Sequence, residues 1–197
     1  MSAKVFRAIK VGVLSVLLLS GAAFAETYSI DPVHSNVAFS IRHIVSRVSG
    51  AFTGVSGTIV YDAEKPEQAS VQATIQTASI NTNNERRDNH LKSPDFFDAE
   101  KYPEIAFKSA KVEKTGDKLM VTGDLTMHGV TKQVVLPVAV LVVGVHPMRK
   151  TPVAGFEAEI TLKRSDFEVN TWTDAANVLG DEVKITLNIE AVVRGEK

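Results

Sequence analysis

The chain has 197 residues, no cysteine and a formal charge of −1 at pH 7. Its length favours a single domain, and the lack of cysteine excludes disulfides, zinc–thiolate centres and iron–sulfur clusters. The chain is mildly acidic and its charges are scattered, which argues against a general nucleic-acid-binding or anionic-membrane-binding protein.

The first 25 residues differ in composition from the rest of the chain. They contain three cations and no acid, then the apolar run Val11–Leu19, and they end with small residues at Ala23 and Ala25. This is the pattern of a secretory signal peptide, and the apolar run is shorter than the roughly 20 residues of a membrane-spanning helix. We therefore predict a signal peptide at 1–25, export to the periplasm, and one mature domain at 26–197 without a transmembrane segment.

A period of two residues dominates the mature chain. Apolar and polar side chains alternate at 36–43, 71–76, 156–163 and 183–191. Such alternation is typical of β-strands with one face directed toward a core. With the shorter apolar segments between them, these stretches predict about eight strands, mostly antiparallel, in either a barrel or a sandwich.

Three local features refine this all-β interpretation. The segment 134–143 is apolar at almost every position except Pro137. We expect it to be covered on both faces or to lie over an internal apolar space, with the proline at an edge or bulge. The pair His128-Gly129 predicts a tight hairpin turn, and glycines interrupting 49–60 indicate bends in a strongly curved sheet.

The exception to the alternation is 83–99, which is rich in charge and has helical spacing. Asp88 and Lys92 stand four residues apart, as in a pair that supports a helix. We expect a short helical excursion here, followed by a turn whose Phe96 and Phe97 cover one end of the barrel.

The sequence offers little sign of catalysis. The five histidines show neither H-x-H nor H-E-x-x-H spacing, and no G-x-S-x-G or phosphate-loop motif is present. His43 continues the apolar face of the strand at 36–43, so it is directed toward the same interior. Two interpretations stay open for it: a core or rim histidine bonded to a backbone carbonyl, or a polar group at the mouth of an apolar cavity.

Several motifs in order along the chain resemble those of the YceI-like family. They are Y-x-I-D-x-x-H-S at 28–35, F-x-I-x-H at 39–43, R-D-x-H-L-K-S-x-D-F-F at 87–97, G-x-L-T-x-H-G-V-T-K at 123–132 and R-x-D-F at 164–167. The motif at 87–97 is quite specific, and together the matches span the whole mature chain.

The resemblance implies a lipocalin-like, extended, eight-stranded antiparallel β-barrel with a short helical excursion at about 83–99. It implies an apolar tunnel that holds a polyisoprenoid, such as a prenyl phosphate or an isoprenoid quinone, or a similar long-chain amphiphile. It further implies a periplasmic binding protein for transport, storage or stress protection, with no catalytic residue, no metal and no cofactor other than the bound lipid.

The motif matches also suggest residue roles. His43 and Arg87 are candidates for the lipid head group, while Asp88 and His90 are expected to fix the helical excursion. The candidates for the apolar tunnel share an inward-facing position and are Val37, Phe39, Ile41, Phe52, Phe96, Phe97, Phe107 and Phe156.

Two other hypotheses remain beside the lipid-binding one. The first is an envelope enzyme acting on an isoprenoid or another lipid, with His43 or His90 as general base. The second is a small structural or stress protein whose barrel is filled by its own side chains. A homodimer is possible in each case, because exposed strand edges tend to pair.

Overall fold

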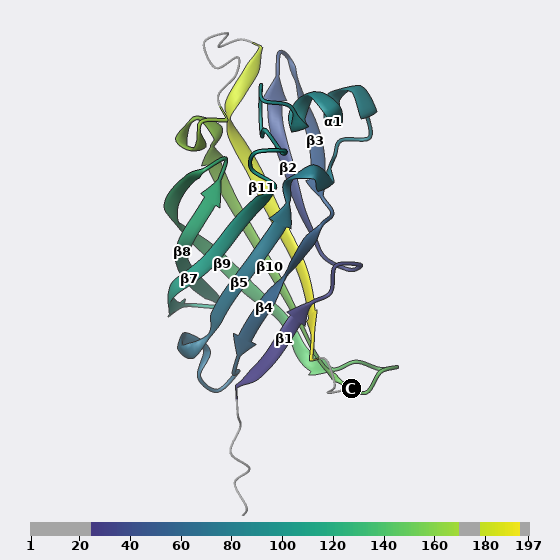
Figure 1. The fold of residues 1–197 in the computed structure, drawn as a ribbon. Helices are drawn as coiled ribbons and strands as arrows, with labels where there is room; N and C mark the ends of the chain where they lie inside the picture. The colour runs from purple at the N-terminus through teal and green to yellow at the C-terminus, as the bar shows by residue number, and fades with distance from the viewer. Residues whose placement is uncertain (1–24, 170–177, 194–197) are drawn as a thin grey trace, which may run out of the picture.

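The computed structural model describes residues 25–169 and 178–193, and most of them lie in β-strands (Figure 1). The predicted signal peptide lies outside the described residues, apart from Ala25. None of the described helices is both long and apolar enough to cross a bilayer. The strands are β1 (Glu26–Ile30), β2 (Asn36–His43), β3 (Ser46–Phe52), β4 (Val55–Tyr61), β5 (Ser70–Gln76), β6 (Ile80–Asn81), β7 (Glu104–Thr115), β8 (Lys118–Met127), β9 (Val130–Val145), β10 (Pro152–Lys163) and β11 (Leu179–Val192), and the α-helix is α1 (Glu85–Lys92).

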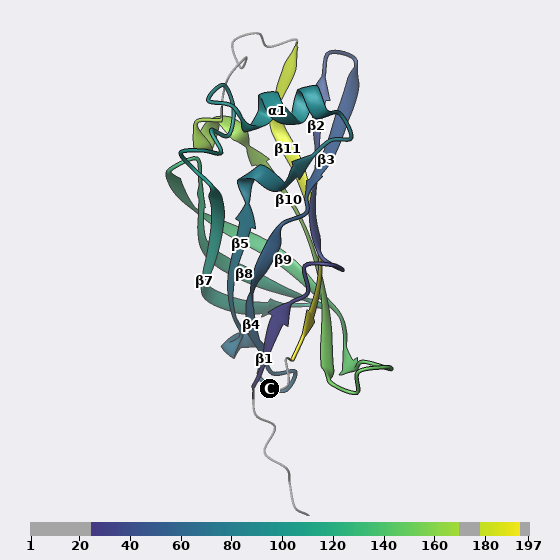
Figure 2. The ribbon, with the colours of Figure 1, turned by 45° about the vertical axis from the view of Figure 1, so that its right-hand side comes forward.

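The sheet closes on itself, because β1 pairs with β4 on one side and with β11 on the other, where Ser29 lies opposite Val192. The ring is β1-β4-β5-β7-β8-β9-β10-β11, which makes eight strand positions. Toward the end that carries α1, the upper end in Figures 1 and 2, β2 and β3 take over the positions of β1 and β4. The fold is therefore the closed, eight-stranded, lipocalin-like antiparallel barrel implied by the family resemblance, and the sandwich alternative is wrong.

The alternation in the sequence becomes the two faces of the barrel wall. On β10, Phe156 and Ala158 are buried, whereas Glu157 and Glu159, which alternate with them, are exposed. The apolar face of each strand can only be removed from water inside the ring, so the closure of the sheet follows from the same pattern that forms the strands.

β9 and β10 separate in the upper half of the barrel. Their ladder ends at the pair Val138–Ala158, above which β9 stays on β8 and β10 stays on β11. The short helical turn η3 (Arg164–Phe167) packs against β9, β10 and β11 near this separation. Pro137 lies just beyond the last β9–β10 pair, at the edge-like place that suits a residue without an N–H.

For the apolar segment 134–143 on β9 we expected either cover on both faces or an internal apolar space, and the structure shows the second. Val134, Leu136 and Val138 face an internal apolar space. The outward face is not covered, since the exposed fraction of Val135 is 43% and that of Leu141 is 60%. The segment is therefore apolar on both faces although only its inner face is buried.

The helical excursion predicted at about 83–99 contains one short helix, followed by turns. The helix α1 begins after Asn84, whose side chain accepts a hydrogen bond from the backbone N–H of Arg87, and it ends at Ser93. Residues 94–97 form turns, as predicted for the segment after the helix. These turns place Phe96 and Phe97 toward the barrel, as a plug for its end requires.

The hairpin between β8 and β9 has the predicted two-residue turn. His128 and Gly129 have φ values of +52° and +79°, the left-handed conformation that such turns favour. A side chain at Gly129 would also come within 2.8 Å of the Tyr102 ring, so glycine is required there for space as well.

Candidate functional site

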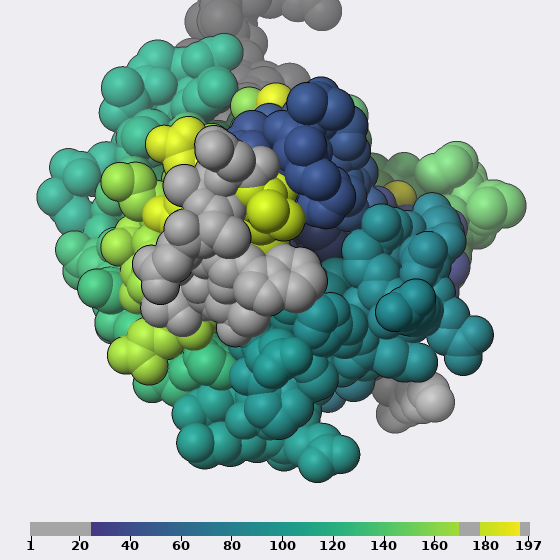
Figure 3. Space-filling model, turned by 90° about the horizontal axis from the view of Figure 1, so that it is seen from above, coloured from purple at the N-terminus to yellow at the C-terminus, as the bar shows by residue number. Residues whose placement is uncertain are grey.

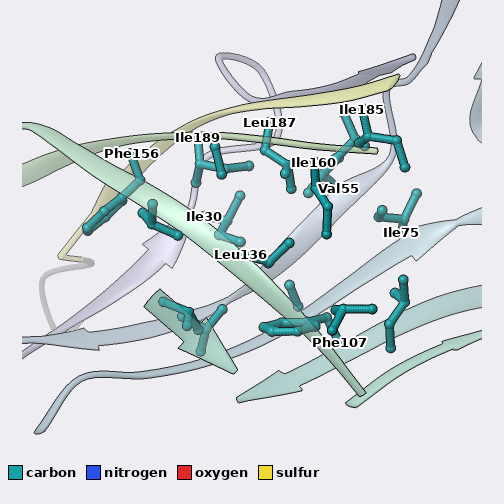
Figure 4. A pocket seen from close by; sticks show the side chains of 18 of the residues that line it. Ile30, Val55, Ile75, Phe107, Leu136, Phe156, Ile160, Ile185, Leu187 and Ile189 are labelled. Carbon is teal, nitrogen blue, oxygen red and sulfur yellow. The ribbon is translucent and has the colours of Figure 1, made fainter. Parts of the chain in front are cut away.

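An apolar cavity runs through the barrel interior, with a volume of about 180 Å³. Residues from all eight strand positions line it, and Figure 4 shows aliphatic and aromatic side chains directed toward one another across it. Only Tyr61 and Glu157 among the lining residues carry a polar side chain, and Glu157 is exposed on the outside. The site therefore presents hydrocarbon almost everywhere.

The lower part of the cavity is narrowed by Tyr61 and Phe156, whose rings meet edge to face at a centroid distance of 5.7 Å. Burial raises the pKa of the Tyr61 hydroxyl, and the charge of Asp62 adds to the effect. Tyr61 is therefore neutral at physiological pH, which keeps charge away from this part of the cavity.

The upper part of the cavity is closed by aromatic side chains. Phe52 lines the cavity, and its ring contacts Phe97 edge to face at 5.6 Å and Phe39 at 5.8 Å. Beyond them a second apolar cluster contains Phe96 and Phe167. Hydrocarbon contacts thus continue from the cavity to the upper end of the barrel.

The predicted tunnel residues divide into two groups. Four of them, Val37, Phe52, Phe107 and Phe156, line the cavity. The other four do not line it: Phe39 and Phe97 lie behind Phe52, Phe96 belongs to the upper cluster, and Ile41 is buried near the end of β2.

The segment that covers the upper end is fixed by a polar cluster around Thr82. The Asp88 carboxylate accepts hydrogen bonds from the Thr82 hydroxyl and from its backbone N–H, at 2.9 Å for the latter. Arg87 donates from Nε to the Thr82 hydroxyl at 2.7 Å and from Nη2 to the Thr82 carbonyl at 2.8 Å. Thr82 is only 4% exposed, so these bonds hold α1 to the strand beneath it in a poorly solvated place.

The remaining polar candidates lie outside the cavity lining. His90 Nε2 stands 3.0 Å from Asp95 Oδ2, and the His90 ring contacts Phe96. His43 is half-buried at the end of β2, and its carbonyl accepts a bond from the Ser46 hydroxyl. Neither His43 nor Arg87 lines the cavity, and nothing in the described part of the chain brings the two together at its mouth.

A buried arginine lies in the turn η3, beside the place where β9 and β10 separate. Arg164, which is 5% exposed, donates from Nε to the Gly180 carbonyl at 2.9 Å and from Nη1 to the Val169 carbonyl at 3.0 Å. Burial lowers the pKa of its guanidinium, while the charge of Asp181 acts in the opposite direction. Arg164 thus joins η3 to the start of β11.

One polar group at the lower end has ligand atoms close enough for a cation. Asp31, His34 and Glu190 each place one such atom within 4.8 Å of the others. Asp31 already accepts a bond from the Val33 N–H at 2.9 Å and lies 3.1 Å from His34 Nδ1, and Arg149 Nη1 is 3.7 Å away. The Val33 N–H, the His34 ring and the Arg149 guanidinium are partners of the carboxylate and account for its position without an ion.

Sequence reasoning on motifs missed most of the cavity lining. The missed residues are mainly aliphatic and lie outside the family motifs, for example Leu119, Leu136, Ile160, Ile185 and Ile189. The signal that finds them is the alternation itself, because every second residue of a closed barrel faces inward.

The family comparison agrees with this architecture. A model of the YceI-like domain matches residues 28–191. The chain belongs to the YceI-like family. Protein YceI of Escherichia coli O157:H7 is 39% identical over 181 residues, which cover 90% of this chain and 93% of that protein.

Solved structures show the same fold as this YceI-like protein. Burkholderia cenocepacia BcnA superimposes with a TM-score of 0.75 at 30% identity, covering 82% of this chain and 98% of that one. A polyisoprenoid binding domain from Saccharophagus degradans superimposes with a TM-score of 0.65 at 17% identity, covering 85% and 98%. At 17% identity, the similarity to the polyisoprenoid binding domain shows a shared fold alone.

Proposed function

We propose that this protein is a non-catalytic periplasmic protein that holds the chain of a polyisoprenoid, or of a similar long-chain amphiphile, in its barrel. The observation that carries the proposal is the cavity, which runs through the barrel interior with almost no polar lining. The polyisoprenoid binding domain of the same fold supports this choice of ligand. A prenyl phosphate and an isoprenoid quinone both have such a chain, and carriage, storage or stress protection are the roles it would serve.

Burial of hydrocarbon supplies enough free energy for such binding. Each buried CH₂ contributes about 0.8 kcal/mol, so one five-carbon isoprenoid unit contributes roughly 3–4 kcal/mol before costs. Ordering the flexible chain and losing the ligand's translational freedom takes back a substantial part of this. A few units are therefore sufficient without polar contacts, which fits a site whose polar groups lie outside the lining.

The position of the histidines favours binding over catalysis. A general base must lie within hydrogen-bond reach of the proton that it removes. His90 is engaged with Asp95, and His43 stands at the end of β2, so neither borders the space in which the lipid chain would lie. The proposal therefore assigns no catalytic residue.

The test is to purify the protein from its native host, extract it with organic solvent and identify bound lipid by mass spectrometry. We expect a long-chain isoprenoid in near-stoichiometric amount. Ala158→Phe, which places a ring in the cavity, should abolish the bound lipid, whereas Thr161→Phe on the exposed face of the same strand should retain it. Absence of any lipid from the native protein, or equal lipid in both variants, would contradict the proposal.

A homodimer is part of the same proposal. β8 pairs with β9 only as far as Ala139, so 140–145 of β9 have β10 as their paired neighbour on one side. This overhang is apolar and exposed, with Leu141 and Val142 each at 60% exposure, and such an edge favours pairing with a second copy. Light scattering of the mature chain distinguishes the monomer from the dimer.

A further inference from the structure

The upper half of the barrel wall contains a stretch in which two neighbouring strands are not paired. The ladder between β9 and β10 ends at Val138–Ala158, so 130–137 of β9 and 159–163 of β10 form no pairs with each other. Over these ranges each strand is paired on its other side, β9 with β8 and β10 with β11. We call these two facing edges, 130–137 and 159–163, the seam.

The cavity reaches the seam from the inside. Val134 and Leu136 of β9 line it, and so do Ile160 and Leu162 of β10. Figure 4 shows Leu136 and Ile160 among the side chains directed into the cavity. Within the described part of the chain, side chains rather than a backbone ladder therefore separate the cavity from the outside at the seam.

The contacts that fill the seam are mainly apolar. The turn η3 packs against β9 and β10, and its Phe167 shares an apolar cluster with Val134 and Leu162. The polar bonds of η3 extend to β11, where the Asp181 carboxylate accepts from the Ser165 N–H at 3.0 Å and from the Ser165 hydroxyl at 2.7 Å. Parting the seam along β9 thus separates hydrocarbon contacts, which a passing lipid chain replaces, and leaves these hydrogen bonds in place.

A second break in pairing, between β3 and β7, is bridged in a different way. On that side β3 forms only two pairs, both with β6. The buried Thr77 donates from its N–H to the Pro103 carbonyl at 2.9 Å and from its hydroxyl to the Tyr102 carbonyl at 2.7 Å. The buried Thr82 is bonded to Asp88 of α1. Opening the barrel there would leave buried polar groups without partners, which is costly.

These two breaks lie on different sides of the upper end. Figure 3 looks down on this end, with the segment of α1 in blue-green on one side and that of η3 in yellow-green on the other. One side is thus fixed by hydrogen bonds to buried groups and the other by apolar contacts, so the seam is the side that opens more easily.

The outer surface beside the seam is apolar as well. Val135 stands between the inward-facing Val134 and Leu136, and its side chain is 43% exposed on the outer face. Pro137 follows it and has no N–H to offer to a ladder. A hydrocarbon chain that passes β9 therefore contacts apolar side chains both outside the wall and inside it.

We propose that the seam is a lateral entrance through which the chain of a lipid enters and leaves the barrel. β9 and β10 part there, while the upper closure around Thr82 stays in place. The inference rests on the proposed function, because it assigns a route to the same ligand. It concerns the rates of binding and release: closing the seam permanently slows both, since the chain crosses the same wall in each direction.

The experiment locks the seam with a chemical link. The sequence contains no cysteine, so introduced cysteines are its only thiols. Val135→Cys with Thr161→Cys places one thiol on the outer face of each edge of the seam. Ala139→Cys with Glu157→Cys is the matched control, because these residues lie directly opposite each other on the same two strands, where the ladder is intact. A short bismaleimide with a disulfide in its spacer joins each pair, and dithiothreitol cleaves the link.

Stopped-flow fluorescence of cis-parinaric acid, a fluorescent long-chain fatty acid, measures binding to the empty protein and release from the loaded protein. We expect the link across the seam to slow both rates by roughly tenfold or more, and its cleavage to restore them. The control link should leave both rates unchanged. A structural disturbance of the barrel would speed release instead of slowing it, which separates a blocked entrance from a damaged binding site.

Three results would overturn the proposal while the proposed function stands. One is unchanged rates in the protein linked across the seam. Another is equal slowing by the control link. The third is binding that is faster in Asp88→Ala, whose upper closure is weakened, and that the seam link does not slow, which would assign entry to the upper end. An unlinked wild type that takes up neither cis-parinaric acid nor geranylgeraniol would contradict the proposed function itself, and the entrance with it.

Discussion

The cavity wall and the segments that close the ends of the barrel depend on different kinds of interaction. The wall consists of apolar side chains that share a single requirement, which is to face inward from a paired strand. The closures depend on particular hydrogen bonds, such as those that join Thr82 to Asp88 above and Asp31 to Val33 below. The difference teaches that the wall should tolerate changes of apolar identity, whereas each closure should be weakened by the loss of one particular polar group.

The largest effect is expected from the upper closure. Asp88→Ala removes the acceptor for the hydroxyl and the N–H of the buried Thr82, so the free energy of unfolding should fall by about 3 kcal/mol. Urea denaturation measures this change. Asp95→Ala is the control, because Asp95 is exposed and its loss should cost less than about 0.5 kcal/mol. Equal losses of unfolding free energy in Asp88→Ala and Asp95→Ala would show that the bonds of Asp88 matter no more than those of an exposed residue.

A smaller effect is expected from the wall. Leu136→Ala should lower the free energy of unfolding by about 2 kcal/mol, at the low end for such a change, because the side chain already borders unfilled space. Leu141→Ala on the same strand is the matched control, since Leu141 is 60% exposed and should change stability by less than about 0.5 kcal/mol. A loss above about 4 kcal/mol for Leu136→Ala would indicate a tightly packed interior.

The lower closure should respond to pH. The Val33 N–H and the His34 side chain hold the pKa of the Asp31 carboxyl below its usual range. The unfolded chain has a carboxyl pKa of about 3.9, so the stabilisation is complete above that pH and disappears as the pH falls through the lower folded value. Asp31→Asn should cost about 1 kcal/mol at neutral pH and flatten the acid limb of stability. If Asp31→Asn loses stability at low pH in the same way as the wild type, other carboxyl groups are responsible for the acid dependence.

The smallest effect has the opposite sign. Ile44→Asn should raise the free energy of unfolding by up to about 1 kcal/mol, because asparagine adopts the left-handed conformation more easily than a β-branched residue. Thermal unfolding monitored by circular dichroism measures the gain. His128→Asn in the two-residue turn between β8 and β9, where Gly129 already favours the backbone, should change stability less. A destabilised Ile44→Asn would mean that the isoleucine makes contacts worth more than its strain.

The wall was predictable from the sequence because its requirement is local. The alternation on β10 and β11 places the apolar residues on one face of the sheet. Closure of the ring then makes this face the inside of the barrel. The division of the predicted aromatic residues was not predictable in this way. Phe52 and Phe107 line the cavity while Phe39 and Phe97 stand behind, and this depends on where β2 and β3 replace β1 and β4 around the ring.

The closures were only partly predictable, because their bonds join residues of several elements. The motif at 87–97 marked Asp88 and Arg87, yet their shared partner Thr82 lies outside it and has no distinctive context. Arg164 belongs to a family motif, but its bonds to Gly180 and Val169 exist only after η3 has packed between the separated strands.

The pairing of β1 with β11 has a consequence for the time course of folding. Ser29 and Val192 are neighbours in the sheet although nearly the whole chain lies between them. Contacts of such large sequence separation form late and slowly, because the entropy of closing a long loop must be met before the contact stabilises anything. Until the last strand arrives, the sheet is an open ribbon with two free edges. We therefore expect refolding to be rate-limited by this closing step, and the chain to be most vulnerable to proteases and to edge-to-edge association before the step is complete.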